Sequence, residues 1–194
     1  SILALIIMNV GFPIYVANAA TVSSFKDTMS TQVPSIAATH TLSWTLVGGD
    51  TVAAADSFTV DFTDADFTLN AIGNWQTSDF SFNDGAARTI VAVSSSSGVD
   101  PTCTAGVNNV AVTINTSTNN FKVVACGSYS ASSANAGITF TINGTATSGT
   151  GTMTNKSTDV DSSLISLSQS NGDSGSAAVA VETNGLVTVT ATVN

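Results

Sequence analysis

The sequence predicts a mainly β protein, in which an N-terminal apolar α-helix precedes an antiparallel β-sandwich head of Ig-like or jelly-roll-like type. Three observations support this. Residues 1–20 contain no charged side chain. Short runs of β-branched and aromatic residues alternate with polar residues through the rest of the chain. Asn-Gly, Asp-Gly and Gly-Gly pairs, which favour tight turns, separate these runs. We therefore divide the chain into an N-terminal segment, 1–22, and a head domain, 23–194.

The N-terminal segment reads SILALIIMNVGFPIYVANAA over residues 1–20. As a helix it would be apolar all round and about 30 Å long, close to the thickness of a bilayer core. Such a helix suits transient residence in a membrane, followed by burial against copies of itself. The side chains that we expect to mediate this assembly are Ile2, Leu3, Leu5, Ile6, Ile7, Val10, Phe12, Ile14 and Val16.

Two other interpretations of this segment stay open. Residues 1–19 fit a secretory signal peptide, because Ala17-Asn18-Ala19 matches the A-x-A cleavage pattern behind an apolar run. The mature protein would then begin at Ala20. Alternatively, the segment acts as an extended donor strand that completes the sheet of another subunit.

The head begins with a polar connector and continues as short strands. Pro34 within 23–38 argues against a helix there. We expect strands at 41–46, 57–62, 67–72, 89–93, 110–114, 121–125, 138–142, 164–167, 177–181 and 186–193. In 186–193 Val and Thr alternate, so one face is buried and the other is wetted by hydroxyls. The preceding Asn184-Gly185 pair predicts a tight hairpin.

Composition narrows the function. Hydrophobic residues make up 43% of the 194 residues and charged residues only 9%, with a net charge of −9. A sizeable core is therefore expected, with a surface of hydroxyl and amide groups that is typical of extracellular assembly proteins. With only four Lys and Arg residues, nucleic acid is excluded as a partner. No catalytic motif is present, so we do not expect an enzyme.

The chain has two cysteines, Cys103 and Cys126. An even count in a chain of extracellular composition predicts one disulfide bond between them. Their spacing contains no CxxC or Cys/His pattern, which argues against a zinc site.

Candidate binding and modification sites are few. Asp61, Asp64 and Asp66 are close in sequence and are weak candidates for a Ca²⁺ site, the one cofactor we consider. Asn115, Asn143 and Asn155 begin N-x-[ST] sequons and are candidate glycosylation sites. His40 is the single histidine, and we expect it to be structural or solvent-exposed. Trp75 follows a Gly-Asn pair, so we consider it a candidate loop residue that could stack on a sugar.

The small first residue, long apolar segment and β-rich remainder resemble a processed type IV pilin, of the divergent archaeal kind. The acidic residue usual at the fifth mature position is replaced by Leu5. The resemblance implies a homopolymeric cell-surface filament, extracellular, whose head adheres to host or surface glycans. The alternative is a secreted monomeric β-sandwich adhesin or glycan-binding protein with residues 1–19 as its signal peptide.

Overall fold

The computed structural model describes residues 22–63, 67–103, 106–144, 151–158 and 160–182. The predicted fold class is wrong in two respects. The described residues contain strands and short 3-10 turns but no α-helix, and the strands do not form two separate antiparallel sheets. Residues 1–21, for which we predict the helix, lie outside the described part of the chain.

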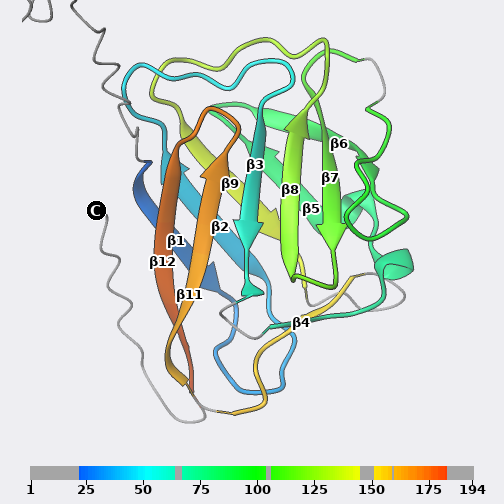
Figure 1. Ribbon diagram of the computed structural model, residues 1–194, viewed down its shortest axis with the longest axis vertical. Coiled ribbons are helices and arrows are strands. Elements are labelled where there is room, and N and C mark those ends of the chain that lie inside the picture. The colour runs from blue at the N-terminus through cyan, green and yellow to red at the C-terminus, as the bar shows by residue number, and fades with distance from the viewer. Residues whose placement is uncertain (1–21, 64–66, 104–105, 145–150, 159, 183–194) are drawn as a thin grey trace, which may run out of the picture.

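The strands are numbered in chain order (Figure 1). They are β1 (Ser23–Met29), β2 (His40–Thr45), β3 (Ser57–Asp61), β4 (Thr68–Leu69), β5 (Phe80–Asn83), β6 (Ala87–Val93), β7 (Asn109–Asn115), β8 (Asn120–Ala125), β9 (Gly137–Ile142), β10 (Met153–Thr154), β11 (Val160–Gln169) and β12 (Ser174–Val181). The 3-10 turns η2 (Ile72–Asn74) and η3 (Thr77–Asp79) precede β5.

One ten-stranded sheet, in the order β1-β2-β9-β5-β6-β7-β8-β3-β11-β12, forms the body of the head. It folds over so that β2, β9 and β5 lie behind β11, β3 and β8 (Figure 1). Strand β6 joins the two layers, because its start pairs with β5 and the rest pairs with β7. The β6–β7 pair is parallel and contains an irregularity between Ile90 and Ala92. Such an irregularity bends a strand, so β6 can leave one layer and continue into the other. The two layers are therefore parts of one continuous sheet.

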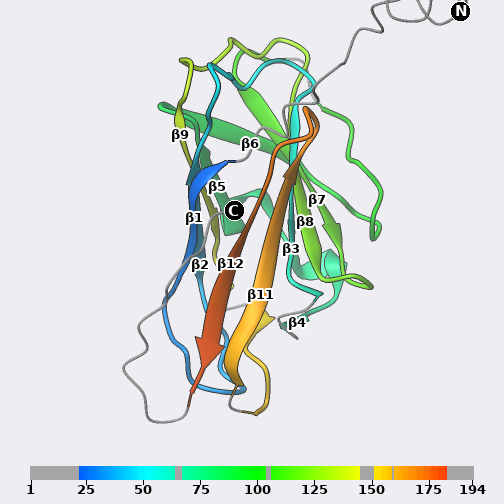
Figure 2. The same ribbon diagram turned by 60° about the vertical axis from the view of Figure 1, so that its left-hand side comes forward.

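The two ends of the sheet come together along β1 and β12 (Figure 2). The Val22 N–H donates to Ser174 O at 3.2 Å, and the Glu182 N–H donates to Gln32 O at 2.9 Å. The strands therefore run in the same direction and touch at both ends without forming a ladder. Gly175 is required at this junction, because a Cβ there would lie 2.5 Å from Val22 Cγ2.

Most predicted head strands are confirmed within three residues at each end, and β11, predicted at 164–167, is longer and begins at Val160. The predicted strand at 67–72 is reduced to the two residues of β4, and 186–193 lies outside the described residues. The connector predicted at 23–38 is wrong at its start, because Ser23–Met29 is a strand that buries Phe25 and Asp27 on one face. Strand β5, with Phe80 and Phe82 facing inward, was not predicted.

Aromatic side chains fill much of the core between the layers. Trp44, expected as a core residue, is 2% exposed and contacts the rings of Phe25 and Phe58. Trp75 is also buried, so its predicted role as a sugar-stacking loop residue is wrong. Its ring stacks on Phe80 with centroids 5.4 Å apart. Gly151 packs directly against the indole, and any side chain at that position would overlap it. Such rings fill the core and supply much of its apolar burial.

Candidate functional site

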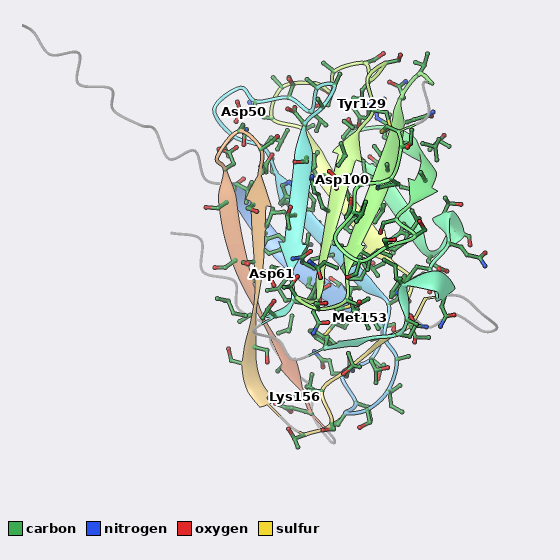
Figure 3. All side chains as sticks on the ribbon, turned by 45° about the vertical axis from the view of Figure 1, so that its right-hand side comes forward. Asp50, Asp61, Asp100, Tyr129, Met153 and Lys156 are labelled. Atoms are coloured by element: carbon green, nitrogen blue, oxygen red, sulfur yellow. A yellow bond between two sulfur atoms is a disulfide. The ribbon has the colours of Figure 1, made fainter. Side chains whose placement is uncertain are left out.

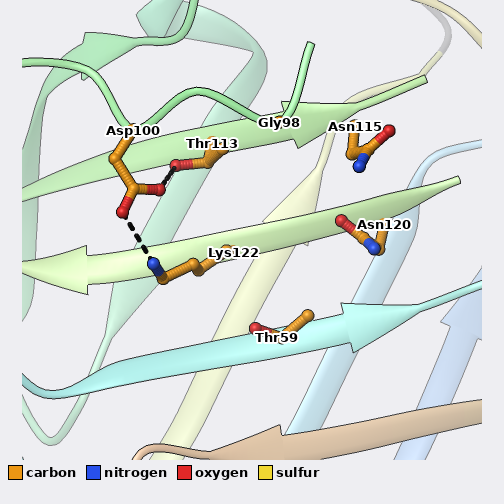
Figure 4. Close-up of a pocket in the computed structure, with 7 residues that line it drawn as sticks. All are labelled: Thr59, Gly98, Asp100, Thr113, Asn115, Asn120 and Lys122. Atoms are coloured by element: carbon orange, nitrogen blue, oxygen red, sulfur yellow. Dashed lines mark hydrogen bonds and ion pairs between the residues drawn. The ribbon is translucent and has the colours of Figure 1, made fainter. Parts of the chain in front are cut away.

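A polar groove on the outer face of β3, β8 and β7 is the candidate functional site (Figure 4). Its side chains sit at the outward positions of strands whose other face carries core residues such as Phe58 and Phe121. The space it encloses is about 370 Å³. The lining residues are Thr59, Gly98, Asp100, Thr113, Asn115, Asn120 and Lys122. The alternation of strand side chains is what gives this face its polar character.

The loop after β6 forms one wall of the groove. Its backbone follows β7, since the Ser94 N–H donates to Val112 O at 2.9 Å and the Gly98 N–H donates to Ile114 O at 2.8 Å. Gly98 has φ of 72° and faces Asn115, whose Nδ2 would be 3.2 Å from an added Cβ. Glycine suits this position because of its left-handed conformation, and a larger residue would also press on the Asn115 amide.

One ion pair lies across the groove. The Lys122 Nζ donates to Asp100 Oδ2 at 2.7 Å, and the Thr113 hydroxyl donates to Asp100 Oδ1 at 2.5 Å. These hydrogen bonds, first from Lys122 and then from Thr113, lower the pKa of Asp100. The carboxylate and the ammonium therefore neutralise one another, and the groove has no net charge from this pair. Both side chains remain partly exposed.

The amides at the other end of the groove are held by the β7–β8 turn. Asn115 Oδ1 accepts hydrogen bonds from the backbone N–H groups of Ser117 and Thr118, at 3.0 and 3.3 Å. Asn120 Nδ2 donates to the Thr118 hydroxyl at 2.8 Å. Asn115 and Asn120 are direct cross-strand partners. The turn thus fixes two amide side chains at the groove surface, which can donate and accept hydrogen bonds.

The predicted disulfide is confirmed: Cys103 and Cys126 are bonded, with their Cα atoms 5.5 Å apart. It ties the loop between β6 and β7 to the residue that follows the end of β8. A disulfide indicates an oxidising environment during folding.

The other predicted site residues are scattered. Asp61 accepts a hydrogen bond from the Thr63 N–H at 2.8 Å, while Asp64 and Asp66 lie outside the described residues. Within the described residues, no group of three or more His, Cys, Asp or Glu side chains is arranged to hold a metal ion. The assembly residues Ile2 to Val16 also lie outside the described part.

The three sequon asparagines differ in environment. Asn115 lines the groove, and Asn143 is exposed with its Oδ1 accepting from the Thr39 hydroxyl at 3.0 Å. Asn155 is 2% exposed, and its Nδ2 donates to Thr31 O and Val33 O at 3.0 and 2.9 Å. In the folded protein the Asn155 nitrogen is therefore inaccessible to a glycan-transferring enzyme.

The single histidine is structural. His40 Nδ1 lies 2.6 Å from Asp27 Oδ2, and neither side chain is exposed. The rings of Phe62 and Phe67 pack edge-on against the imidazole, at 5.3 and 4.8 Å between centroids. A residue enclosed in this way joins β1 to β2 through their side chains and is not accessible to a substrate.

Two further carboxylates are buried near the end of the molecule where Figure 3 labels Asp50 and Tyr129. Asp84 makes two hydrogen bonds with Arg88, at 2.6 and 2.9 Å, and accepts one from the Tyr129 hydroxyl at 2.6 Å. The hydrogen bond from Arg88 to Asp84 raises the pKa of the Arg88 guanidinium. The pKa of the Tyr129 hydroxyl is also raised, first by burial and then by its hydrogen bond to Asp84. The other is Asp173, which is 1% exposed and shares the Asn171 amide with Asp50.

The buried carboxyl group of Asp173 should make the free energy of unfolding depend on pH. Burial, and then the nearby Asp50, raise the pKa of Asp173 in the folded protein. Its contribution to stability is therefore full below the ordinary carboxyl pKa and is lost as the pH rises through the raised value. We expect Asp173→Asn to raise the free energy of unfolding at neutral pH, with the gain shrinking toward pH 4. Urea unfolding of both proteins across this range tests it, and a gain independent of pH would contradict it.

No protein-family model matches the chain, and no curated protein or solved structure is significantly similar to it. Among the residues that the structure describes, no helix has the length and apolar character needed to cross a membrane. The residues of the groove were not identified from the sequence. Their only signal was a polar residue at alternate positions of the predicted strands 57–62 and 121–125.

Proposed function

We propose that this chain is a structural subunit of an extracellular cell-surface filament, in which copies shield the apolar segment 1–20 from water and the β-rich head is exposed. The observation that carries the proposal is the direct junction between the two parts. Val22 is fully buried and hydrogen-bonded to Ser174, and β1 begins at Ser23. In sequence, only Thr21 separates this uncharged segment of 20 residues from the head.

The head has features that suit such a role. Its disulfide fits an oxidising, extracellular environment. Arg88 forms an ion pair with Asp84 and Lys122 forms one with Asp100. The outward faces of the strands carry mostly hydroxyl and amide groups. These groups form hydrogen bonds with water, so the head can remain hydrated although it has few charged side chains. The resemblance to type IV pilins points in the same direction.

Burial of the apolar segment would drive assembly. Removing apolar surface from water contributes about 25 cal/mol per Å², and residues 1–20 are almost entirely apolar. Association also has a cost, because translational and rotational freedom are lost. The nine apolar side chains that we expect to mediate assembly, from Ile2 to Val16, would supply the favourable contribution that offsets this cost. The head would then be available to adhere to host or surface glycans.

Deleting residues 1–20 is expected to abolish fibre formation while leaving a folded, singly dispersed head. A sharper variant is Ile6→Asp, which places one charge in the apolar segment and leaves the head untouched. Negative-stain electron microscopy and analytical ultracentrifugation of the full chain and both variants provide the measurement. Ser43→Asp, on the outer face of β2, is the matched control because it adds the same charge to the head.

The account requires the full chain and Ser43→Asp to form fibres and Ile6→Asp to remain dispersed. Fibres of unchanged length from the Ile6→Asp protein would show that the apolar segment does not mediate assembly. A full chain that stays monomeric would instead favour the secreted adhesin.

A further inference from the structure

The groove belongs to a larger polar surface that crosses five strands. Strand register places the outward residues of β7, β8, β3, β11 and β12 in two straight rows. The first row is Thr113, Lys122, Thr59, Ser168 and Ser174; the second is Asn115, Asn120, Asp61, Ser166 and Ser176. With strands about 4.8 Å apart, each row is roughly 19 Å long. We call these ten side chains the polar face.

The polar face carries hydrogen-bonding groups and very little charge. All of its members except Lys122 and Asp61 are Ser, Thr or Asn. Lys122 is neutralised by Asp100 at 2.7 Å. Hydroxyl and amide groups act both as donors and as acceptors, so the face matches a ligand that also has both. The outward positions of these two rows contain no large apolar side chain, which disfavours a lipid or an apolar peptide.

We propose that the polar face, centred on the groove between Asp100 and Asn120, binds a neutral oligosaccharide chain that runs across the strands. Sugar hydroxyls offer closely spaced donors and acceptors that pair with Thr59, Asn120 and their neighbours. The elongated, shallow shape suits a chain of several sugar rings more than a small enclosed ligand. Because the protein carries a net charge of −9, an anionic polysaccharide would be repelled.

Rigidity favours the same assignment. The face is set on five adjacent, hydrogen-bonded strands of the sheet, and Asn115 and Asp100 are already held by hydrogen bonds to the turn and to Thr113. A preorganised surface loses little side-chain entropy on binding, which compensates for weak individual contacts. All ten side chains of the polar face belong to the head, and none belongs to residues 1–20.

Fluorescence polarisation of labelled oligosaccharides tests this with the full chain, in its monomeric or its assembled state. The ligands are cellohexaose, chitohexaose and a mannohexaose, with oligogalacturonate as the anionic comparison. We expect at least one neutral ligand to bind and the anionic one not to bind. The double variant Thr59→Val, Asn120→Leu is expected to weaken binding by about tenfold or more, since two hydrogen-bonding groups are lost.

The matched control is Ser43→Ala, Thr139→Val. These residues form a cross-strand pair in a second shallow groove on β2 and β9 and have similar exposure. The control should bind as the unmodified protein does, and thermal unfolding should show all three proteins folded. The proposal is overturned if no neutral ligand binds more tightly than about 1 mM, if oligogalacturonate is preferred, or if the Thr59, Asn120 variant binds normally. Fibres are scored separately by microscopy, so loss of binding is not confused with loss of assembly.

Discussion

Replacing Asp84 with alanine is expected to reduce the free energy of unfolding by about 3–5 kcal/mol, the cost typical of breaking a buried ion pair from one side. Asp84 is fully buried, and the side chain of Arg88 is 7% exposed. The variant leaves the guanidinium without its carboxylate and the Tyr129 hydroxyl without its acceptor at 2.6 Å. Urea unfolding followed by tryptophan fluorescence measures the loss.

The surface pair Lys122–Asp100 provides the control. Its N–O distance is 2.7 Å, against 2.6 Å for Arg88–Asp84, but its side chains are 34% and 53% exposed. Asp100→Ala should therefore cost only about 0–1 kcal/mol. Similar losses in the two variants would show that burial is not what gives the Asp84 cluster its importance.

Removing the disulfide is the second large effect. Cys103 and Cys126 are separated by 23 residues, and a loop of this length corresponds to about 3 kcal/mol in the chain-entropy description. The bond also anchors the connection between the parallel strands β6 and β7. We expect the double variant Cys103→Ala, Cys126→Ala to have a free energy of unfolding lower by about 3 kcal/mol. Its midpoint in urea unfolding should be lower accordingly.

Reducing agent provides an independent check. It should destabilise the unmodified protein by a similar amount and leave the double variant unchanged. A protein whose unfolding midpoint does not respond to reductant would contradict this role for the disulfide.

Local patterns predicted the strands of the head well. Alternation of apolar and polar residues located β2, β3, β8 and β9, because each of these strands buries one face. Turn chemistry was equally informative: the Asn171-Gly172-Asp173 turn joins β11 to β12, with Gly172 at φ of 99°. Cysteine count was sufficient for the disulfide.

Sheet topology could not be predicted in the same way. Nothing in residues 94–108, which are rich in Ser and Gly, indicates that they connect two parallel strands. The prediction of separate antiparallel sheets therefore failed at β6. Strand β1 was missed because its polar residues, including Lys26 and the buried Asp27, conceal the alternation. Trp75 was misplaced since its burial depends on Gly151, far away in the sequence.

The groove depends on register between distant strands. Thr59 and Lys122 are neighbours only because β3 pairs with β8, across 63 positions of sequence. Each of these residues reads locally as an ordinary exposed strand position. Of the groove residues, only Asn115 belongs to a recognisable sequence motif, its N-x-[ST] sequon. A binding surface made of Ser, Thr and Asn has no sequence motif, so the structure is needed to bring its members together.

The most direct test of the central claim is peptide mapping by mass spectrometry of the protein recovered from native cell surfaces, after separation into sedimenting and soluble fractions. The account predicts that residues 1–20 are retained on subunits in sedimenting fibres. Recovery of the protein only in the soluble fraction, beginning at Ala20, would contradict it.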